Sequence, residues 1–176
     1  IWFAEFDGID KTWLQDSVRR VAARPGAGPR HGVFHRSRPL LYIVNELDST
    51  LATYRLDASD CECIGMTDLL PSGFTGHNQA AGIALDRTGE RLFVSNRGHE
   101  TLSTLAIAPA TGIPELTGWM PCEGKMPRFI TLCPAQASLV VAYEQSDAIR
   151  IFPIDDASLR NPLGASQQVA STGSPT

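Results

Sequence analysis

The sequence has little that points to a membrane or to nucleic acid. No apolar run approaches the roughly 20 residues that a membrane-spanning helix needs. The net charge of the 176 residues is −4, so there is no basic surplus of the kind that nucleic-acid-binding proteins carry. The hydrophobic fraction of 43% is that of a globular protein with a substantial core. We therefore expect a cytoplasmic protein without a membrane or nucleic-acid partner, in which a few arginines inside one cleft could still bind a small anion.

Cysteine is scarce, and its spacing disfavours the common metal sites. The four cysteines are Cys61, Cys63, Cys122 and Cys133, and they form no pair of CxxC motifs. A zinc site at the first two would need two further well-spaced ligands, which the sequence does not offer. A Gly-rich phosphate loop and a nucleophile elbow are also missing. We expect free thiols in a reducing compartment, with no metal and no cofactor.

Helical periodicity is absent as well, whereas the sequence contains an internal repeat of about 50 residues. Residues 40–45 align with residues 91–96 at an offset of 51, and residues 138–143 follow 47 positions later. Each copy is β-branched and aromatic and is broken by turn residues, which is typical of four-stranded propeller blades. The predicted fold class is all-β, a β-propeller with about 3.5 blades in this chain.

The repeat also predicts where the strands and blades lie. Residues 1–170 form a partial propeller, in which 1–24 are the outer half of a blade with strands near 2–6 and 18–22, and 171–176 are a frayed tail. Three complete blades cover 25–72, 73–121 and 122–170. Their expected strands are 32–35, 40–45, 51–56 and 63–69 in the first blade, 82–85, 91–96, 101–107 and 115–119 in the second, and 129–132, 139–143, 148–154 and 167–170 in the third.

A half ring of blades exposes two apolar faces that a closed ring would bury. The missing blades are therefore supplied either by the rest of a longer chain or by a second subunit. We favour the longer chain, because the sequence starts with Ile1 in the middle of a blade.

Several motifs resemble those of the propeller-type lactonase family. Residues 26–35, GAGPRHGVFH, are similar to its GxGPRHxxFHP signature, and residues 42–50, YIVNELDST, to its YVxNExxST stretch. Residues 86–99, DRTGERLFVSNRGH, resemble PDGRxLYVSNRGH, and 126–129, MPRF, resemble the PRxF that opens the next blade. Arg36 and Arg87 depart from the pattern, since each stands where the family pattern has proline. The resemblance covers residues 1 to about 169 and implies a seven-bladed ring.

The family includes 6-phosphogluconolactonases and 3-carboxy-cis,cis-muconate lactonising enzymes, so the resemblance implies an anionic substrate. Lactone hydrolysis needs a base to activate water and positive charge where the carbonyl oxygen gains charge. By resemblance, Glu46, Arg30 and Arg97 are the catalytic candidates, and each lies at a strand end or in the loop beyond it. The alternatives are a bracing role for Arg30 and a merely solvated carboxylate at Glu46.

Three further residues are candidates for substrate binding. Arg128 repeats the position of Arg30 in the third copy, and His77 precedes an innermost strand at the expected channel mouth. His31 directly follows Arg30, so a regular strand would point the two side chains in opposite directions. Three functions stay open on the sequence: a lactone hydrolase, most simply of 6-phosphogluconolactone; a muconate cycloisomerase; and a non-catalytic propeller fragment or interaction module. The partner expected for either enzyme is a phosphorylated sugar lactone or a polycarboxylate.

Overall fold

A computed structural model describes residues 1–57, 60–133, 137–155, 157–158 and 162–171 of the chain. These residues form strands and turns, and none of them is helical. The strands are β1 (Trp2–Asp7), β2 (Thr12–Arg20), β3 (Pro29–Phe34), β4 (Leu40–Asn45), β5 (Thr50–Leu56), β6 (Cys61–Asp68), β7 (Gln79–Leu85), β8 (Arg91–Arg97), β9 (Thr101–Ile107), β10 (Pro114–Pro121), β11 (Pro127–Cys133), β12 (Ser138–Tyr143), β13 (Ala148–Pro153) and β14 (Gln167–Ser171).

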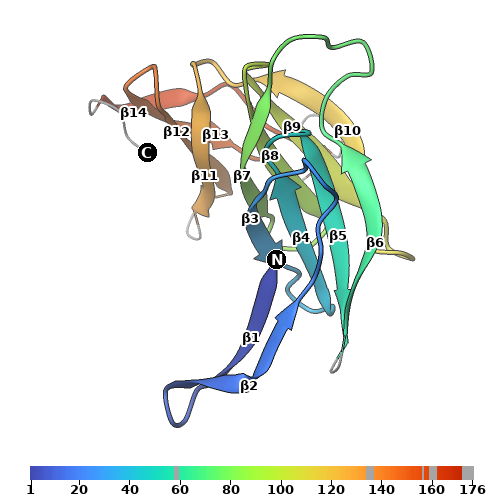
Figure 1. Ribbon diagram of the computed structural model, residues 1–176. Helices are drawn as coiled ribbons and strands as arrows, with labels where there is room; N and C mark the ends of the chain where they lie inside the picture. The colour runs from blue at the N-terminus through green and yellow to red at the C-terminus, as the bar shows by residue number, and fades with distance from the viewer. Residues whose placement is uncertain (58–59, 134–136, 156, 159–161, 172–176) are drawn as a thin grey trace.

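The strands are arranged as the blades of a propeller (Figure 1). β3 to β6, β7 to β10 and β11 to β14 each form a four-stranded antiparallel sheet in sequence order, and β1 and β2 form a hairpin. The three innermost strands, β3, β7 and β11, lie next to one another, with β7 in contact with both of the others. The predicted all-β partial propeller is therefore confirmed.

The strand bounds follow the repeat closely, and the differences gather at the innermost strands. β4 and β9 span the predicted residues, whereas β3 and β7 begin three residues earlier than predicted and β11 two residues earlier. β2 begins at Thr12 and not at residue 18, so the first hairpin is longer than expected. The predicted tail begins with Ser171, which ends β14, and its remaining residues, 172–176, lie outside the described part of the chain.

The hydrophobic core lies between the sheets. Tyr42 and Leu51 of the first complete blade pack with Leu92 of the second in one cluster. Phe93 of the second blade packs with Phe152 of the third in another. Side chains alternate across a strand, so β8 sends successive residues into the two clusters and is buried at every position. The middle blade thus packs against the first complete blade on one face and against the third on the other.

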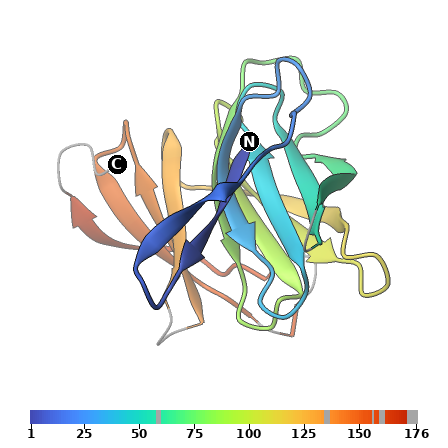
Figure 2. The same ribbon diagram turned by 60° about the horizontal axis from the view of Figure 1, so that its bottom comes forward.

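The β1–β2 hairpin is only partly covered. It packs Phe3 against the first complete blade, but Trp2, Ile9 and Trp13 are at least 60% exposed. In Figure 1 the hairpin projects away from the three four-stranded sheets, and in the turned view of Figure 2 it passes in front of them. An apolar surface of this kind is expected where further blades continue the ring. Across the described residues, no helix has the length and hydropathy needed to cross a membrane.

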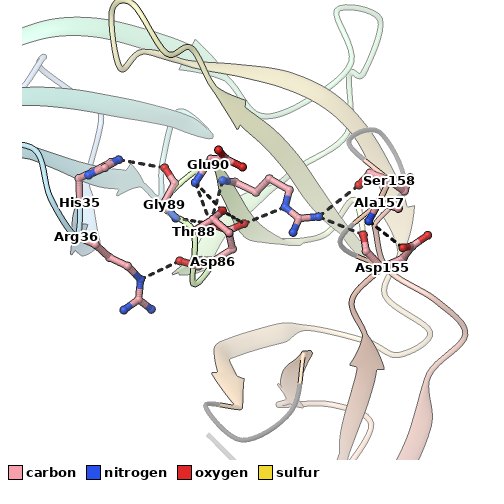
Figure 3. A network of polar contacts seen from close by, with 10 residues as sticks. His35, Arg36, Asp86, Thr88, Gly89, Glu90, Asp155, Ala157 and Ser158 are labelled. Carbon is pink, nitrogen blue, oxygen red and sulfur yellow. Dashed lines mark hydrogen bonds and ion pairs between the residues drawn. The ribbon is translucent and has the colours of Figure 1, made fainter.

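A buried aspartate organises the turn between β7 and β8 (Figure 3). Oδ1 of Asp86 accepts backbone hydrogen bonds from Gly89, Glu90 and Arg91 at 2.8, 2.9 and 3.2 Å. Oδ2 accepts from the Thr88 hydroxyl and from the Arg91 guanidinium, each at 2.9 Å. The charged pair is 4% exposed on both sides. The expected hairpin is therefore built around an ion pair.

The same turn joins the neighbouring blades (Figure 3). On one side, Nε2 of His35 donates to the Gly89 carbonyl at 3.0 Å, and Nε of Arg36 donates to the carbonyl of Asp86 at 2.9 Å. On the other side, Nη1 of Arg91 donates to the carbonyl of Asp155 at 3.2 Å. This network lies at the opposite end of the sheets from the residues described next.

Candidate functional site

The candidate site lies where the innermost strands begin and the second strands end. Pro29 pairs with Asn45 in the first complete blade, and Pro127 pairs with Tyr143 in the third. In the blade between them, β8 ends at Arg97, opposite the first residue of β7. Because β7 contacts both β3 and β11, these three strand ends meet at one edge of the molecule. Polar side chains from three successive blades therefore converge there.

Glu46 is held between two arginines of neighbouring blades. Its Oε1 is 2.6 Å from Nη2 of Arg97, and its Oε2 is 3.3 Å from Nε of Arg30. Hydrogen bonds between ionised partners are the strong ones, so the two guanidinium groups fix the orientation of this carboxylate. The structure brings together the three residues for which the sequence predicts catalytic roles, and those roles stay a prediction.

Arg97 is the most deeply placed member of this group. Its side chain is 4% exposed, and its buried Nε finds no hydrogen-bond partner in the described part of the chain. The next residue, Gly98, has a φ of 110°, and a Cβ there would collide with the backbone oxygen of His77. Only glycine fits this turn without strain. The chain therefore turns sharply after Arg97, and the hydrogen bond to Glu46 orients the guanidinium.

Arg30 and His31 lie close together, against the alternation of a regular strand. The pairing of β3 with β4 jumps from Pro29 to Gly32, so a β-bulge contains both residues. Nη1 of Arg30 is 3.0 Å from Nδ1 of His31 and donates to the carbonyl of Ala81 at 3.1 Å. The expectation that His31 points away from Arg30 is wrong, because alternation holds only where pairing is regular.

Burial and neighbouring cations shape the charges of the site. Burial, and after it Arg97, lowers the pKa of Arg30, although Glu46 opposes this shift. An arginine starts from a pKa so high that it stays cationic at neutral pH. Burial, and after it Arg30, lowers the pKa of His31 below its usual 6.5. The imidazole is therefore neutral at pH 7 and can accept a hydrogen bond from Arg30.

The third blade repeats the ion pair of the first. Nη1 of Arg128 is 2.9 Å from Oε2 of Glu144, and both side chains are more than one third exposed. Sixteen residues separate the two members, as they separate Arg30 and Glu46. The sequence analysis named Arg128 and missed Glu144. The repeated spacing is the signal that could have found it.

These five groups give the site a net positive charge. Three guanidiniums, of Arg30, Arg97 and Arg128, stand against two carboxylates, of Glu46 and Glu144. The pKa of Arg30 responds to all four of the other groups, which shows that they act within one electrostatic neighbourhood. Such a surplus of guanidinium groups favours anionic ligands, which arginine binds in a bidentate manner.

His77 is not part of this contact network. Its side chain is exposed and makes no hydrogen bond or ion pair with any described residue. It lines a neighbouring pocket together with Phe74, Asn78 and Leu47, and the last of these directly follows Glu46. The structure therefore places His77 in a pocket with Leu47, the neighbour of Glu46, and its role in substrate binding stays a prediction.

Metal-binding groups do not assemble in the described residues. No cluster of three or more His, Cys, Asp or Glu side chains there could hold a metal ion, and the four cysteines are unpaired. The chemistry that the site offers is that of one oriented carboxylate, fixed guanidinium donors and a neutral imidazole. This set can bind an anion and stabilise negative charge on an oxygen atom.

Comparison with known proteins gives consistent results. A family model described as "Lactonase, 7-bladed beta-propeller" matches residues 3–176. The 6-phosphogluconolactonase of Pectobacterium atrosepticum is 36% identical over 132 residues, which are 74% of this chain and 40% of that protein. The 6-phosphogluconolactonase of Bacillus subtilis is 28% identical over 165 residues, 89% of this chain and 47% of that protein.

Solved structures agree with this picture. The structure of a periplasmic gluconolactonase of Pseudomonas aeruginosa superposes with a TM-score of 0.81 at 31% identity. The match covers 89% of this chain and 43% of that one. The chain thus spans less than half the length of these relatives.

Proposed function

Because the chain belongs to the family of lactonases built on a seven-bladed β-propeller, we propose that the whole protein hydrolyses the lactone of a sugar acid, with 6-phosphogluconolactone as the leading substrate. The observation that carries this proposal is the carboxylate of Glu46 held by Arg30 and Arg97. The names of the relatives support the substrate class. The remaining blades complete the ring and supply the rest of the site, most simply from the same polypeptide.

In the proposed reaction, Glu46 removes a proton from a water molecule as the water oxygen attacks the lactone carbonyl carbon. The carbonyl oxygen gains negative charge, which Arg97 and Arg30 stabilise without reorganising, since both are already fixed. The ring C–O bond then breaks, and the alkoxide takes up the proton held by Glu46. The product is the open hydroxy acid, and no cofactor is needed.

Arg128, His31 and His77 are proposed to bind the substrate. Arg128 is more exposed than Arg97, so it can exchange its ion pair with Glu144 for a contact with a phosphate. With Nδ1 of neutral His31 accepting from Arg30, Nε2 carries the ring proton and can donate a hydrogen bond to a sugar hydroxyl. His77 lines the pocket that also contains Leu47 and would contact the end of the substrate away from Glu46.

The test uses the full-length protein and 6-phosphogluconolactone, with the spontaneous rate subtracted. Glu46→Gln should abolish turnover if Glu46 is the base, whereas Glu46→Asp should retain part of it. If Glu46 only positions the arginines, Glu46→Gln raises KM and leaves kcat and its pH profile unchanged. Turnover of 3-carboxy-cis,cis-muconate without any lactonase activity would overturn the proposal in favour of a cycloisomerase.

We also propose a cytoplasmic location. Four unpaired cysteines fit a reducing compartment, where thiols persist. The solved Pseudomonas relative is described as periplasmic, so the periplasm is the alternative location that the test has to distinguish. Cell fractionation with an antibody against the full-length protein tests the location, and recovery from the periplasm would contradict it.

A further inference from the structure

A second pocket lies at the opposite end of the innermost strands. It is lined by Val33 and Arg36 of the first complete blade, by Ile83, Ala84, Leu85 and Arg87 of the second, and by Thr131 and Leu132 of the third, with a volume of about 400 Å³. β3 runs from the candidate site to this pocket over six residues. At 3.3 Å per residue, Arg30 of the candidate site and Val33 of the pocket are about 10 Å apart along β3, and no residue of the candidate site lines the pocket. The pocket is therefore separate from the candidate site.

The composition of the pocket is amphipathic. Its floor consists mainly of aliphatic side chains, whereas Arg36 and Arg87 are exposed at its rim. None of the described residues that line it is a carboxylate. Unlike the arginines of the candidate site, neither of these two forms an ion pair with a described residue.

The two arginines are differently held. Nε of Arg36 donates to the carbonyl of Asp86, whose own side chain is fixed by the buried pair with Arg91. Figure 3 shows the two terminal nitrogens of Arg36 directed away from this network, and they form no hydrogen bond within the described chain. Arg87 forms no hydrogen bond or ion pair with the described residues. The unused donors of both arginines, of which only Arg36 is held in place, lie beside aliphatic side chains and suit an anion with an apolar body.

The sequence pattern singles out the same two positions. Arg36 and Arg87 are the residues that stand where the lactonase pattern has proline. Proline would suffice for the turn geometry at these places. Both substitutions add a guanidinium to the same pocket, although they lie on different blades.

From this pocket we propose a second binding site, independent of the lactonase proposal, for a small organic anion that carries one carboxylate on an aliphatic body. The carboxylate lies between Arg36 and Arg87, and the aliphatic body lies on Ile83 and Leu132. Burial of the aliphatic body contributes favourably to the free energy of binding, and the guanidinium groups favour anions over neutral or cationic ligands. The site requires no chemical step.

The test is isothermal titration calorimetry of octanoate, octylammonium and octan-1-ol into the full-length protein. The wild type should bind octanoate at millimolar concentration or tighter and should bind octanol much more weakly. Arg36→Ala together with Arg87→Ala should weaken octanoate binding about tenfold or more, since hydrogen bonds to charged groups are worth about that factor. Arg55→Ala, which alters an exposed arginine of β5 outside the pocket, is the matched control and should bind as the wild type does.

Charge reversal provides a second variant whose folding is not at risk, because Arg87 is exposed and has no partner to lose in the described chain. Arg87→Glu should abolish octanoate binding and favour octylammonium. Equal binding of octanoate and octanol by the wild type, or octanoate affinity within twofold of wild type in the double variant, would overturn the proposal. Lactone turnover is measured alongside and should not change, so a failure here is distinguishable from a failure of the proposed function.

Discussion

At the scale of single residues, the site depends on how completely one arginine is enclosed. Arg97 is 4% exposed, donates to Glu46 and is followed by a glycine in the left-handed region. The equivalent position is Glu46 in the first complete blade and Glu144 in the third, so the middle blade reverses the charge of the repeat. This reversal places a cation next to the carboxylate of the first blade.

Replacing Arg97 tests this arrangement. Arg97→Ala should lower kcat/KM for the lactone about 100-fold or more, as expected for loss of a fixed donor to a developing oxyanion. The burial of Arg97 adds a loss of about 1–3 kcal/mol in the free energy of unfolding, because Glu46 loses its shortest partner. Steady-state kinetics and a denaturant titration measure the two effects. Arg97→Lys is the control, since it keeps the charge and loses the planar geometry. Unchanged turnover in Arg97→Ala would remove this residue from the site.

The outer ion pair makes a different prediction. Arg128→Ala should raise KM for 6-phosphogluconolactone about tenfold or more, while the values for unphosphorylated gluconolactone change little, because only the former has a phosphate to bind. Glu144→Gln should lower KM for 6-phosphogluconolactone or leave it unchanged, because it releases Arg128 from its ion pair. Equal losses with both lactones would contradict a phosphate contact and assign Arg128 to general positioning.

At the scale of elements, the repeat predicts the strands well but not their irregularities. Residues 40–45 and 101–107 form strands as predicted, because runs rich in β-branched and aromatic residues, bounded by turn residues, recur at a fixed spacing. The bulges at the start of β3, β7 and β11 carry no comparable sequence signal. These bulges determine the directions of the side chains of Arg30, His31 and Arg128. The motifs therefore identify residues of the candidate site but do not predict how their side chains are arranged.

Contacts between elements were the least predictable part. The sequence indicates a hairpin near residues 86–89, but it does not reveal that Asp86 binds Arg91 in a buried pair or that three blades meet there. Likewise, the ion pair between Glu46 and Arg97 joins one blade to the next. Such pairs depend on how adjacent sheets stack, which spacing along one chain does not specify.

The Asp86 turn yields a prediction about stability and acid. Burial raises the pKa of Asp86, but hydrogen bonds from Arg91, Thr88 and the backbone together hold it below its ordinary 3.8. The pKa of Asp86 is lower in the folded state than in the unfolded state, so ionised Asp86 adds to the free energy of unfolding. This contribution is complete above the ordinary pKa of 3.8 and is lost as the pH falls through the pKa of the folded state. Asp86→Ala should cost about 3–5 kcal/mol at pH 7, since it leaves Arg91 without its buried partner.

Urea denaturation of the wild type and Asp86→Ala between pH 2 and 7 measures this contribution. The difference in unfolding free energy should stay constant from neutral pH to about pH 4 and should shrink below it. Asp48→Ala, at a more exposed ion pair with Arg24, is the control and should cost about 1 kcal/mol or less. A difference that does not change with pH would show that the ion pair is not its source.

At the scale of the whole molecule, the described blades present an unfinished ring. The β1–β2 hairpin exposes Trp2, Ile9 and Trp13, whereas β8 in the middle blade is fully covered. We retain 25–72, 73–121 and 122–170 as the proposed blade boundaries. In the proposed whole protein, blades outside this chain cover the exposed hairpin and complete the mouth in which Glu46 lies.

Expression of residues 1–176 alone tests this picture. The segment should bind the dye 8-anilinonaphthalene-1-sulfonate and should associate at micromolar concentration, because its apolar hairpin has no neighbour. The full-length protein should do neither. Trp13→Ser in the segment should reduce both effects. A monomeric segment that binds no dye would indicate that the hairpin does not need further blades.

The most direct test of the central claim is a crystal structure of the full-length protein with bound 6-phosphogluconate, the product of the proposed reaction. The account predicts the product carboxylate within hydrogen-bond distance of the guanidinium groups of Arg97 and Arg30 and beside the carboxylate of Glu46, with the phosphate on Arg128. Product bound elsewhere, with the contacts of Glu46 to both arginines unchanged and no atom of the ligand touching them, would contradict it.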